Sequence, residues 1–338
     1  MSLSSHTDDY FDFDTDLEDK WADYLTYEDK ALQRGRARQA HRTGKHKEKH
    51  QAKKSREEVL ETLADEVELL TGFAPTYLQN FDPKHHEYRW LMESLSGFYQ
   101  DKVLADVLRI VKAGKEANVY TCTGTAVSNH PLMAAKLYRP RMLRHLRNDA
   151  VYKEGRFIRD QSGKEQRGGR VTRALQKKTR FGQDLDFMTW IGHEFEMQKM
   201  LFAAGADVPE PIAQRGNTIL MGYVGDENQP APTLIETSLA AGEAERLFER
   251  IMENVRLMLS LNYVHGDLSA YNILYWAGRI TIIDFPQLAD ARVNNNAFTL
   301  LERDVQRVYD YFAPYGITAD PVERTAKLWE AWMNGALE

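Results

Sequence analysis

The segment GDLSAYN, residues 266–272, holds an acid and an amide five positions apart in a short polar stretch. The acid is Asp267 and the amide is Asn272. The next strand-like run, residues 280–283, is followed by a second acid, Asp284. A polar loop, a hairpin and a strand-end acid, in this order, would bring three oxygen-bearing side chains to one place. Because carboxylate and amide oxygens suit Mg²⁺, this segment predicts phosphate chemistry with a magnesium ion.

Phosphoryl transfer would give these side chains different tasks. We expect Asp267 to accept or orient the proton of an attacking hydroxyl or water, and Asn272 and Asp284 to bind Mg²⁺. We expect His265 to have a structural role, packing and hydrogen bonding within the loop. Asp and Asn are also ordinary turn residues, and an HGD tripeptide alone is common by chance. The spacing of both acids, after a lysine in a strand and a glutamate in a helix, favours the metal-and-base hypothesis.

Upstream, a lysine interrupts the apolar strand-like run LMAAKLY, residues 132–138. An ammonium group is usually excluded from such a position, and burying it without a partner would cost several kcal/mol. Lys136 therefore predicts a carboxylate partner and an anionic ligand. Glu194 on the following predicted helix is the first candidate for the pair and Glu196 the second. Such a pair would aim the ammonium at nucleotide phosphates. The alternative is a lysine at the strand edge whose ammonium reaches water.

The pattern around these motifs predicts a small sheet followed by helices. VLRIVKAGKEANVYTCTG, residues 107–124, reads as two strands joined by a turn at Gly114, and residues 217–224 form a further strand. A glycine lets backbone N–H groups approach phosphate oxygens, but this loop alone favours ordinary turn chemistry. Helices are predicted at residues 186–205 and 242–261. The order suggests an α+β fold with a cleft between two lobes.

Composition and charge set broader limits. The chain has 338 residues, 43% of them hydrophobic and 28% charged, enough for one two-lobed unit or two domains. The formal net charge of −6 conceals segregation, because residues 1–30 are acidic whereas residues 33–56 carry ten Lys or Arg against the single acid Glu48. A solvating tail and an anionic contact such as RNA are equally open for this basic segment. Cys122 is the single cysteine, so no intrachain disulfide can form.

The sequence also carries expectations about location. No apolar run approaches the length of a membrane span, and the start, MSLSSHTDDYFDFD, is acidic rather than typical of a secretion signal. We therefore expect a cytoplasmic protein.

Six segments together resemble one family. GKEANVY, AAKLYR, ILMGYVGDENQPAPTL, YVHGDLSAYNILY, ITIIDFPQ and LLERDVQRVYDYF are similar to the RIO family of atypical serine/threonine protein kinases, nearer its type-one branch. The resemblance runs from about Val107 to Tyr315. It implies a two-lobed, protein-kinase-like α+β fold. A small antiparallel sheet with one main helix would form the N-lobe and helices most of the C-lobe, without the usual activation and peptide-docking segments.

The resemblance implies ATP and Mg²⁺ as cofactors and gives roles to named positions. It makes Lys136 and Glu194 the phosphate-contacting ion pair, Asp267 the catalytic base, and Asn272 and Asp284 the metal ligands. Met221 would lie at the rear of the adenine pocket, and Tyr223 and Val224 would offer backbone hydrogen bonds. The nucleotide-contacting residues that it implies are Gly114, Lys115, Glu116, Ala117, Asn118, Val119, Lys136, Met221, Tyr223 and Val224.

The expected organisation has four segments. They are an acidic then basic mobile arm (1–56), a helical N-terminal extension (57–106), a kinase N-lobe (107–221) with a long basic insertion (139–182), and a kinase C-lobe (222–338). Three features depart from the family pattern. Gly222 stands where the linker between lobes commonly has an acid, the segment between Lys136 and Glu194 is unusually long, and the first hundred residues are particular to this chain.

These observations predict an ATP- and Mg²⁺-dependent phosphotransferase that transfers the γ-phosphoryl group to a protein serine or threonine, or to water as an ATPase switch. One alternative is a small-molecule kinase of the aminoglycoside or choline type, which also shows HGD, a following Asn and an ID pair. Another is a nucleotide-gated scaffold that binds RNA or a ribosomal subunit through residues 34–56 and 139–180. The sequence leaves the phosphate acceptor, the protein partner and the oligomeric state open.

Overall fold

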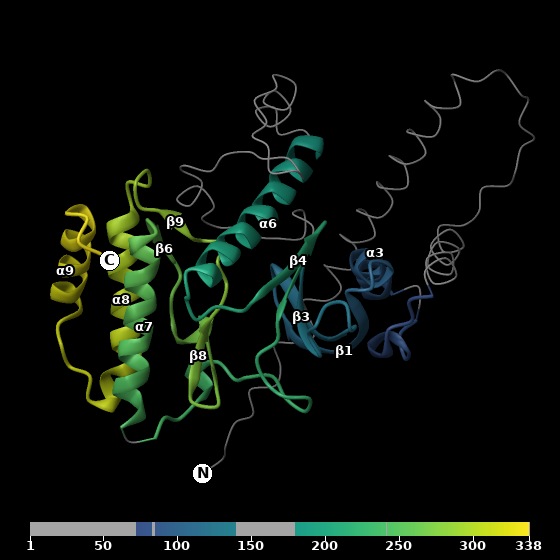
Figure 1. Cartoon of the computed structure of the whole chain (residues 1–338), viewed down its shortest axis with the longest axis horizontal. Coiled ribbons are helices and arrows are strands. Elements are labelled where there is room, and N and C mark those ends of the chain that lie inside the picture. Colours follow the sequence, from purple (N-terminus) through teal and green to yellow (C-terminus); the bar gives the residue numbers. More distant parts are fainter. Residues whose placement is uncertain (1–71, 83–84, 140–179, 241, 338) are drawn as a thin grey trace, which may run out of the picture.

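The computed structural model describes residues 72–82, 85–139, 180–240 and 242–337, which form an α+β unit with a sheet lobe and a helical lobe (Figure 1). The predicted fold class is confirmed. The predicted basic arm at 34–56, the first part (57–71) of the predicted helical extension and nearly all of the basic insertion at 139–180 lie outside the described residues. In the part of the chain that the structure describes, no helix is long and apolar enough to cross a membrane.

The sheet lobe contains one antiparallel sheet of five strands in the order β1-β2-β3-β5-β4. The strands are β1 (Leu104–Ala113), β2 (Ala117–Gly124), β3 (Leu132–Tyr138), β4 (Pro211–Arg215) and β5 (Thr218–Gly222). The sequence analysis found four of them but not β4. Its sequence, PIAQR, lacks a strand pattern of its own, and it is an edge strand that pairs only with β5. A proline at the start of such a strand is tolerated because an edge leaves one side unpaired.

The alternation of β3 gives its two faces different environments. Met133, Ala135 and Leu137 belong to the apolar cluster beneath the N-terminal helix α3 (His86–Gln100). Tyr138 packs on the other face, against a cluster that includes a residue of helix α6. Lys136 shares that face by the two-residue period, and it stands in register between Val119 and Ile219 of the neighbouring strands. The sheet therefore presents the lysine toward α6.

Helix α6 (Arg180–Ala203) lies between the sheet and the helical lobe in Figure 1. It begins six residues before the predicted start at Asp186, so its first turn overlaps the end of the predicted insertion. Residues 180–185 contain no proline, and a single glycine costs a helix only about 1 kcal/mol, so nothing local prevents this extension. The helix stops before Gly205, whose φ of +85° lies in the left-handed region that helix C-termini favour.

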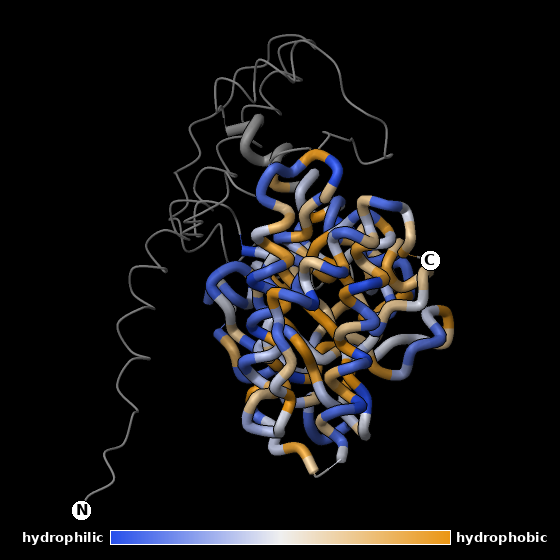
Figure 2. Tube along the Cα trace, turned by 90° about the vertical axis from the view of Figure 1, so that its left-hand side faces the viewer, coloured by the Kyte–Doolittle hydropathy of each residue, from blue (hydrophilic) through white to orange (hydrophobic). Residues whose placement is uncertain are grey.

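The helical lobe packs three helices around one apolar cluster. These are α7 (Glu243–Ser260), α8 (Ala297–Phe312) and α9 (Pro321–Met333), and the lobe also contains the strands β6 (Tyr263–Val264), β7 (Ile273–Trp276), β8 (Arg279–Ile282) and β9 (Ala289–Asp290). Asp320 caps α9 by accepting a hydrogen bond from the Val322 amide, and Pro321 fits the first helical position. Apolar and polar stretches alternate along the described chain, as expected of elements that bury one face (Figure 2).

Only residues 285–296 separate Asp284 from α8. The long activation segment that many protein kinases carry at this point would not fit in so short a connection, as the resemblance implied.

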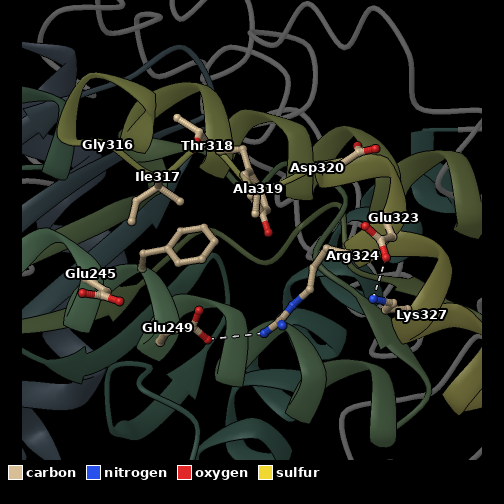
Figure 3. Close-up of a pocket in the computed structure, with 12 residues that line it drawn as sticks. Glu245, Glu249, Gly316, Ile317, Thr318, Ala319, Asp320, Glu323, Arg324 and Lys327 are labelled. Atoms are coloured by element: carbon tan, nitrogen blue, oxygen red, sulfur yellow. Dashed lines mark hydrogen bonds and ion pairs between the residues drawn. The ribbon is translucent and has the colours of Figure 1, made fainter.

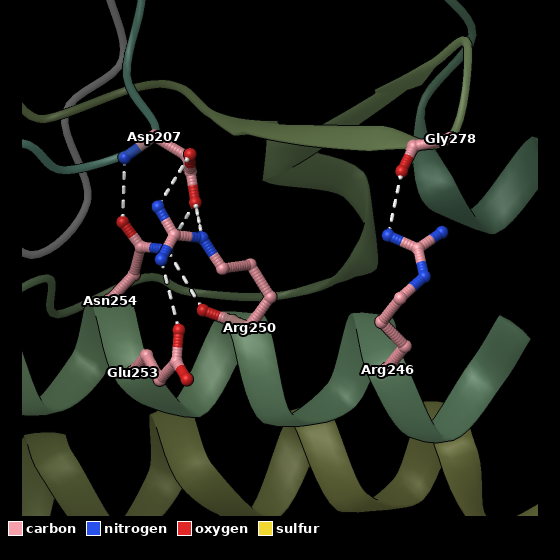
Figure 4. A network of polar contacts seen from close by, with 6 residues as sticks. All are labelled: Asp207, Arg246, Arg250, Glu253, Asn254 and Gly278. Carbon is pink, nitrogen blue, oxygen red and sulfur yellow. Dashed lines mark hydrogen bonds and ion pairs between the residues drawn. The ribbon is translucent and has the colours of Figure 1, made fainter.

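Asp207 ties three elements together at the junction of the lobes (Figure 4). Its backbone N–H donates to Asn254 Oδ1 over 2.7 Å. Its carboxylate accepts from Asn254 Nδ2 over 2.7 Å and from Arg250 Nη2 over 3.0 Å. Its backbone carbonyl accepts from the Ile282 amide over 2.7 Å. Arg250 and Asn254 lie on α7 and Ile282 ends β8. The segment that leads from α6 into β4 is thus fixed to the helical lobe.

We expect Asp207→Ala to lower the free energy of unfolding by about 1–3 kcal/mol, because it removes an acceptor from the buried side-chain amide of Asn254 and breaks the ion pair with the exposed Arg250. Urea denaturation of the purified protein would measure the change. Lys327→Ala is a matched control, because it removes an exposed ion pair of 2.7 Å to Glu323 within one helix, and should cost less than about 0.5 kcal/mol. Equal losses in the two variants would contradict the proposed role of Asp207.

Candidate active site

The ammonium group of Lys136 lies between two carboxylates that come from different elements. Its Nζ is 2.9 Å from Oε1 of Glu194 on α6 and 2.8 Å from Oδ1 of Asp284, which follows β8. The Glu194 side chain is 3% exposed and the Lys136 side chain 13%, so the charges are largely removed from water. Glu196, the second candidate for this pair, instead contacts Lys199 at the surface. The structure thus brings together the lysine, glutamate and second aspartate that the sequence singled out.

These charges stabilise one another. Burial acts to lower the pKa of Lys136, but Asp284 and then Glu194 outweigh it and hold the pKa well above its usual value. Burial likewise acts to raise the pKa of Asp284, yet the neighbouring ammonium leaves that pKa below its usual value. Lys136 and Asp284 are therefore both charged at neutral pH, as an anionic ligand and a cation site require.

Tyr138 completes this cluster and was not among the predicted site residues. Its hydroxyl donates to Oε2 of Glu194, and its ring centroid lies 5.0 Å from Nζ of Lys136. The contact with the ring face is a cation–π interaction, which also holds the ammonium in place. The available signal was its position two residues after Lys136, on the same face of β3.

The loop after β6 holds Asp267 and Asn272 against each other. Asn272 Nδ2 donates to the Asp267 carbonyl over 2.8 Å and lies 3.3 Å from its Oδ2. Because this nitrogen bonds to Asp267, the amide oxygen is the atom available to a cation. The Asn272 backbone carbonyl accepts a hydrogen bond from the Ile283 backbone amide over 2.9 Å. Asn272 is thus held next to Ile283, the neighbour of Asp284 in the chain.

The donor set suits Mg²⁺ if phosphate oxygens complete it. Asp284 adopts φ +75°, an uncommon backbone conformation for a residue with a side chain, and its side chain is 45% exposed and so accessible to a cation. Mg²⁺ is commonly held by one or two carboxylates together with substrate phosphates. Among the described residues, no group of three or more His, Cys, Asp and Glu could hold a metal by itself. Asn272 and Asp284 therefore fit a metal that arrives with a nucleotide.

Helix α8 holds this loop in place by the hydrogen bonds of three residues that the sequence analysis did not select. Asp304 accepts from the Gly266 amide over 2.7 Å and from the Leu268 amide over 3.0 Å. Arg303 donates to the Gly266 carbonyl, and Arg307 Nη1 donates to Oδ1 of Asp267 over 2.8 Å. The signal for Asp304 was an acid among apolar residues that recur at helical spacing. Together they form a buried stripe of α8 made up of Leu300, Leu301, Asp304, Val305 and Val308.

Gly266 and His265 fix the start of the loop. Gly266 adopts φ +80°, and a Cβ added there would lie 2.4 Å from the carbonyl oxygen of Gln287, so a side chain does not fit. His265 is buried, with Nε2 3.2 Å from the Ile283 carbonyl and Nδ1 accepting from the Asp267 amide over 3.3 Å. Burial lowers its pKa, which favours the neutral ring. His265 thus has the packing and hydrogen-bonding role expected of it.

The predicted phosphate loop is a tight turn between β1 and β2. The Gly114 amide donates to the Ala117 carbonyl over 3.1 Å and to Asn118 Oδ1 over 3.3 Å. A Cβ on Gly114 would lie 2.6 Å from that carbonyl oxygen. Lys115 and Glu116 are exposed at its tip, and Asn118 is buried. The nucleotide contacts of this loop, including those of Ala117 and Val119, remain predictions.

The residues predicted to surround adenine lie around the end of β5, with Met221 inside the strand and Tyr223 and Val224 just beyond it. Met221 packs against the cluster of Tyr138, on the face of the sheet that carries Lys136. The Tyr223 hydroxyl accepts from Arg109 over 3.2 Å, and the Val224 carbonyl accepts from the Ala231 amide over 2.9 Å. The place of Met221 at the rear of an adenine pocket and the adenine contacts of Tyr223 and Val224 remain predictions.

A separate hollow of about 360 Å³ lies between α7, α8 and α9 (Figure 3). Phe248 and Tyr309 contribute to its wall, and four acids and two cations also line it. Two of those acids are already paired, since Arg324 contacts Glu249 over 3.3 Å and Lys327 contacts Glu323 over 2.7 Å. None of the predicted site residues lines this hollow.

Comparisons with known proteins match these features to one family. The family model for the RIO domain matches residues 118–325. Serine/threonine-protein kinase rio1 of Schizosaccharomyces pombe is 29% identical over 211 residues, which cover 62% of this chain and 38% of that protein. RIO-type serine/threonine-protein kinase Rio1 of Haloferax volcanii is 30% identical over 212 residues, covering 62% of this chain and 64% of that protein. The human serine/threonine-protein kinase RIO1 is 27% identical, covering 64% of this chain and 34% of that protein.

A solved structure is also similar. It is the Rio2 kinase-ADP/Mg²⁺-phosphoaspartate complex from Chaetomium thermophilum, with a TM-score of 0.48 and 20% identity, covering 73% of this chain and 70% of that one. The chain spans between about a third and two thirds of the length of the three curated relatives given above.

The buried carboxyl group of Asp304 predicts a pH dependence of stability. Burial raises its pKa from 3.8 to about 7, although the Gly266 and Leu268 amides act to lower it. Between about pH 4 and 7 the folded state therefore holds one proton more than the unfolded state. The stability that this proton contributes is complete below about pH 4 and is lost as the pH rises through about 7. The stability advantage of wild type over Asp304→Asn should fall across this window by at most about 4 kcal/mol.

Urea titrations of both proteins at pH 4, 5.5 and 7.5 would measure this difference, in which groups common to the two proteins cancel. A difference that is constant with pH, or that grows as the pH rises, would show that Asp304 is ionised throughout.

Proposed function

Since this chain belongs to the RIO domain family, with relatives that place it on the type-one branch, we propose that it is an ATP- and Mg²⁺-dependent phosphotransferase. It transfers the γ-phosphoryl group of ATP to a serine or threonine hydroxyl of a protein, or to water. The relatives are named serine/threonine-protein kinases, which supports a protein acceptor over a small amino alcohol.

One observation carries the proposal: the contact of Lys136 with both Glu194 and Asp284. A buried ammonium held by two carboxylates is costly as a purely structural device, because each ion loses its hydration. It is useful where an anion and a cation must bind side by side. Lys136 then contacts phosphate oxygens, Glu194 keeps the ammonium in position, and Asp284 contributes oxygen to the cation.

The loop residues act on the acceptor. As the bond between the acceptor oxygen and the γ-phosphorus forms, the bond from that phosphorus to the bridging oxygen of ADP breaks, and the acceptor proton moves to Asp267. Arg307 and Asn272 each contact one carboxylate oxygen of Asp267, which orients the group before the acceptor arrives. Bound Mg²⁺ neutralises charge on the phosphate oxygens. Most of the rate enhancement comes from positioning and charge neutralisation.

The acidic residues make separable predictions. Asp267→Ala should lower ATP turnover by at least about a hundredfold, the typical worth of a general base, and leave ATP affinity within about twofold. Asp284→Ala should weaken Mg²⁺-dependent ATP binding, because it removes a metal ligand. Turnover of radiolabelled ATP and calorimetric titration with ATP, with and without Mg²⁺, would measure the two effects.

Asp310→Asn is the matched control, because Asp310 is an exposed acid on α8 that accepts a hydrogen bond from Gln306 Nε2 over 2.7 Å. It should turn over ATP like wild type. Wild-type turnover in both alanine variants would remove the assignment of the site.

The identity of the acceptor separates the three candidate functions. Label that appears on a protein or in free phosphate supports the proposal, whereas label on an amino alcohol supports a small-molecule kinase. Negligible transfer, together with RNA affinity that falls steeply with salt and changes with ATP, supports the nucleotide-gated scaffold.

A further inference from the structure

We propose that Glu87, on the N-terminal helix α3, is a positioning residue for the phosphate loop and acts on it through a chain of hydrogen bonds. The proposal rests on the proposed function, because it takes the turn at Gly114 as the loop that binds ATP phosphates. The match to the RIO domain begins at residue 118, so α3 lies outside it.

The chain of hydrogen bonds joins residues from three segments. Glu87 Oε1 accepts from the Tyr77 hydroxyl over 3.1 Å and from the Tyr120 hydroxyl over 2.7 Å. Asn118 Nδ2 then donates to the Tyr120 hydroxyl oxygen over 3.1 Å, and the Gly114 amide donates to Asn118 Oδ1 over 3.3 Å. The path therefore leads from α3 through the interior of β2 to the turn.

The carboxylate sets the direction of every bond along this path. An ionised carboxylate can only accept, so the single proton of the Tyr120 hydroxyl points to Glu87. The hydroxyl oxygen is then an acceptor, which selects the nitrogen end of the Asn118 amide. The oxygen end of that amide in turn faces the Gly114 N–H. Without an acceptor at Glu87, the hydroxyl is free to rotate and the amide loses one of the contacts that distinguish its two ends.

Burial makes the loss of any of these hydrogen bonds costly. Tyr120 is 0% exposed and Asn118 4%, so a lost partner is not replaced readily by water. Burial and then the charge of Glu87 raise the pKa of Tyr120, which keeps its hydroxyl protonated as a donor. Arg139 Nη2 also donates to Asn118 Oδ1 over 3.1 Å, which adds to the hold on the oxygen end.

Packing makes α3 a fixed support for this path. Leu91, Met92 and Leu95 of the helix are fully buried in one cluster with Tyr120 and Met133 of the sheet. The view in Figure 1 places α3 beside the sheet lobe, away from helices α7 to α9. A displacement of α3 would thus be transmitted to the turn at the start of β2, without a direct contact between helix and nucleotide.

The test compares Glu87→Leu, which removes the acceptor and keeps most of the volume, with Glu87→Gln, which keeps an acceptor oxygen. Tyr120→Phe removes the middle link with little change in packing. Glu93→Leu is the matched control on the same helix, since Glu93 contacts Arg89 over 2.7 Å and takes no part in the path. Calorimetric titrations would measure the affinities for Mg²⁺-ATP and for adenosine, and steady-state kinetics the KM for ATP and kcat.

We expect Glu87→Leu and Tyr120→Phe to weaken ATP binding and raise KM about tenfold, equivalent to the loss of one ordered hydrogen bond to the loop. Adenosine affinity and kcat should stay within about twofold, because adenosine does not use the phosphate loop. Glu87→Gln and Glu93→Leu should resemble wild type. A general structural fault would instead weaken both ligands together.

The outcomes separate this inference from the proposed function. Two results in a protein whose wild type binds ATP would overturn the role of Glu87 and leave the proposed function standing. In one, Glu87→Leu and Tyr120→Phe bind ATP as tightly as wild type does. In the other, both variants lose as much affinity for adenosine as for ATP. If wild type binds no ATP, the proposed function fails and the role of Glu87 with it.

Discussion

The ion triad of Lys136, Glu194 and Asp284 is the constraint on which the site depends. The charges of Lys136 and Glu194 are removed from water to a degree that would be unfavourable alone, and the pairing with each other and with the partly exposed Asp284 compensates for that loss. The triad joins β3, α6 and the end of the β7–β8 hairpin, and so joins the two lobes. A change in the relative position of the lobes would therefore separate these charges and change the charge state of the site.

The rest of the molecule supports this triad with buried polar contacts from each side. Helix α8 holds the loop of Asp267 through the Asp304 carboxylate, whose backbone partners would be left without acceptors if that side chain were removed. Asp207 does the same at the junction of the lobes. In the sheet lobe, Glu87 orders the bonds that reach Gly114. Each support is a carboxyl group that accepts hydrogen bonds from its neighbours and so fixes where their donors point.

The two ends of the chain differ in how they relate to the family. The matched region, residues 118–325, contains Lys136, Asp267, Asn272 and Asp284, whereas α3 and β1 precede it. The long connection between Lys136 and α6 lies largely outside the described residues, and it is also the most basic part of the matched region. The candidate site residues thus lie in the part that matches the family, whereas α3 and β1 lie outside it.

The sequence by itself determined most of the local elements and the residue types that meet at the candidate site. Period-two and helical patterns predicted β3, α7 and the β7–β8 hairpin, because such patterns record which face is buried. It missed β4, which is stabilised by pairing with β5, and placed the start of α6 six residues late, since no local signal marks either. Only the tertiary structure decided that Lys136 contacts Asp284, 148 positions away, and that Asp304 and Arg307 hold the Asp267 loop. Contacts at such separations depend on how elements pack, and packing is not encoded in any one of them.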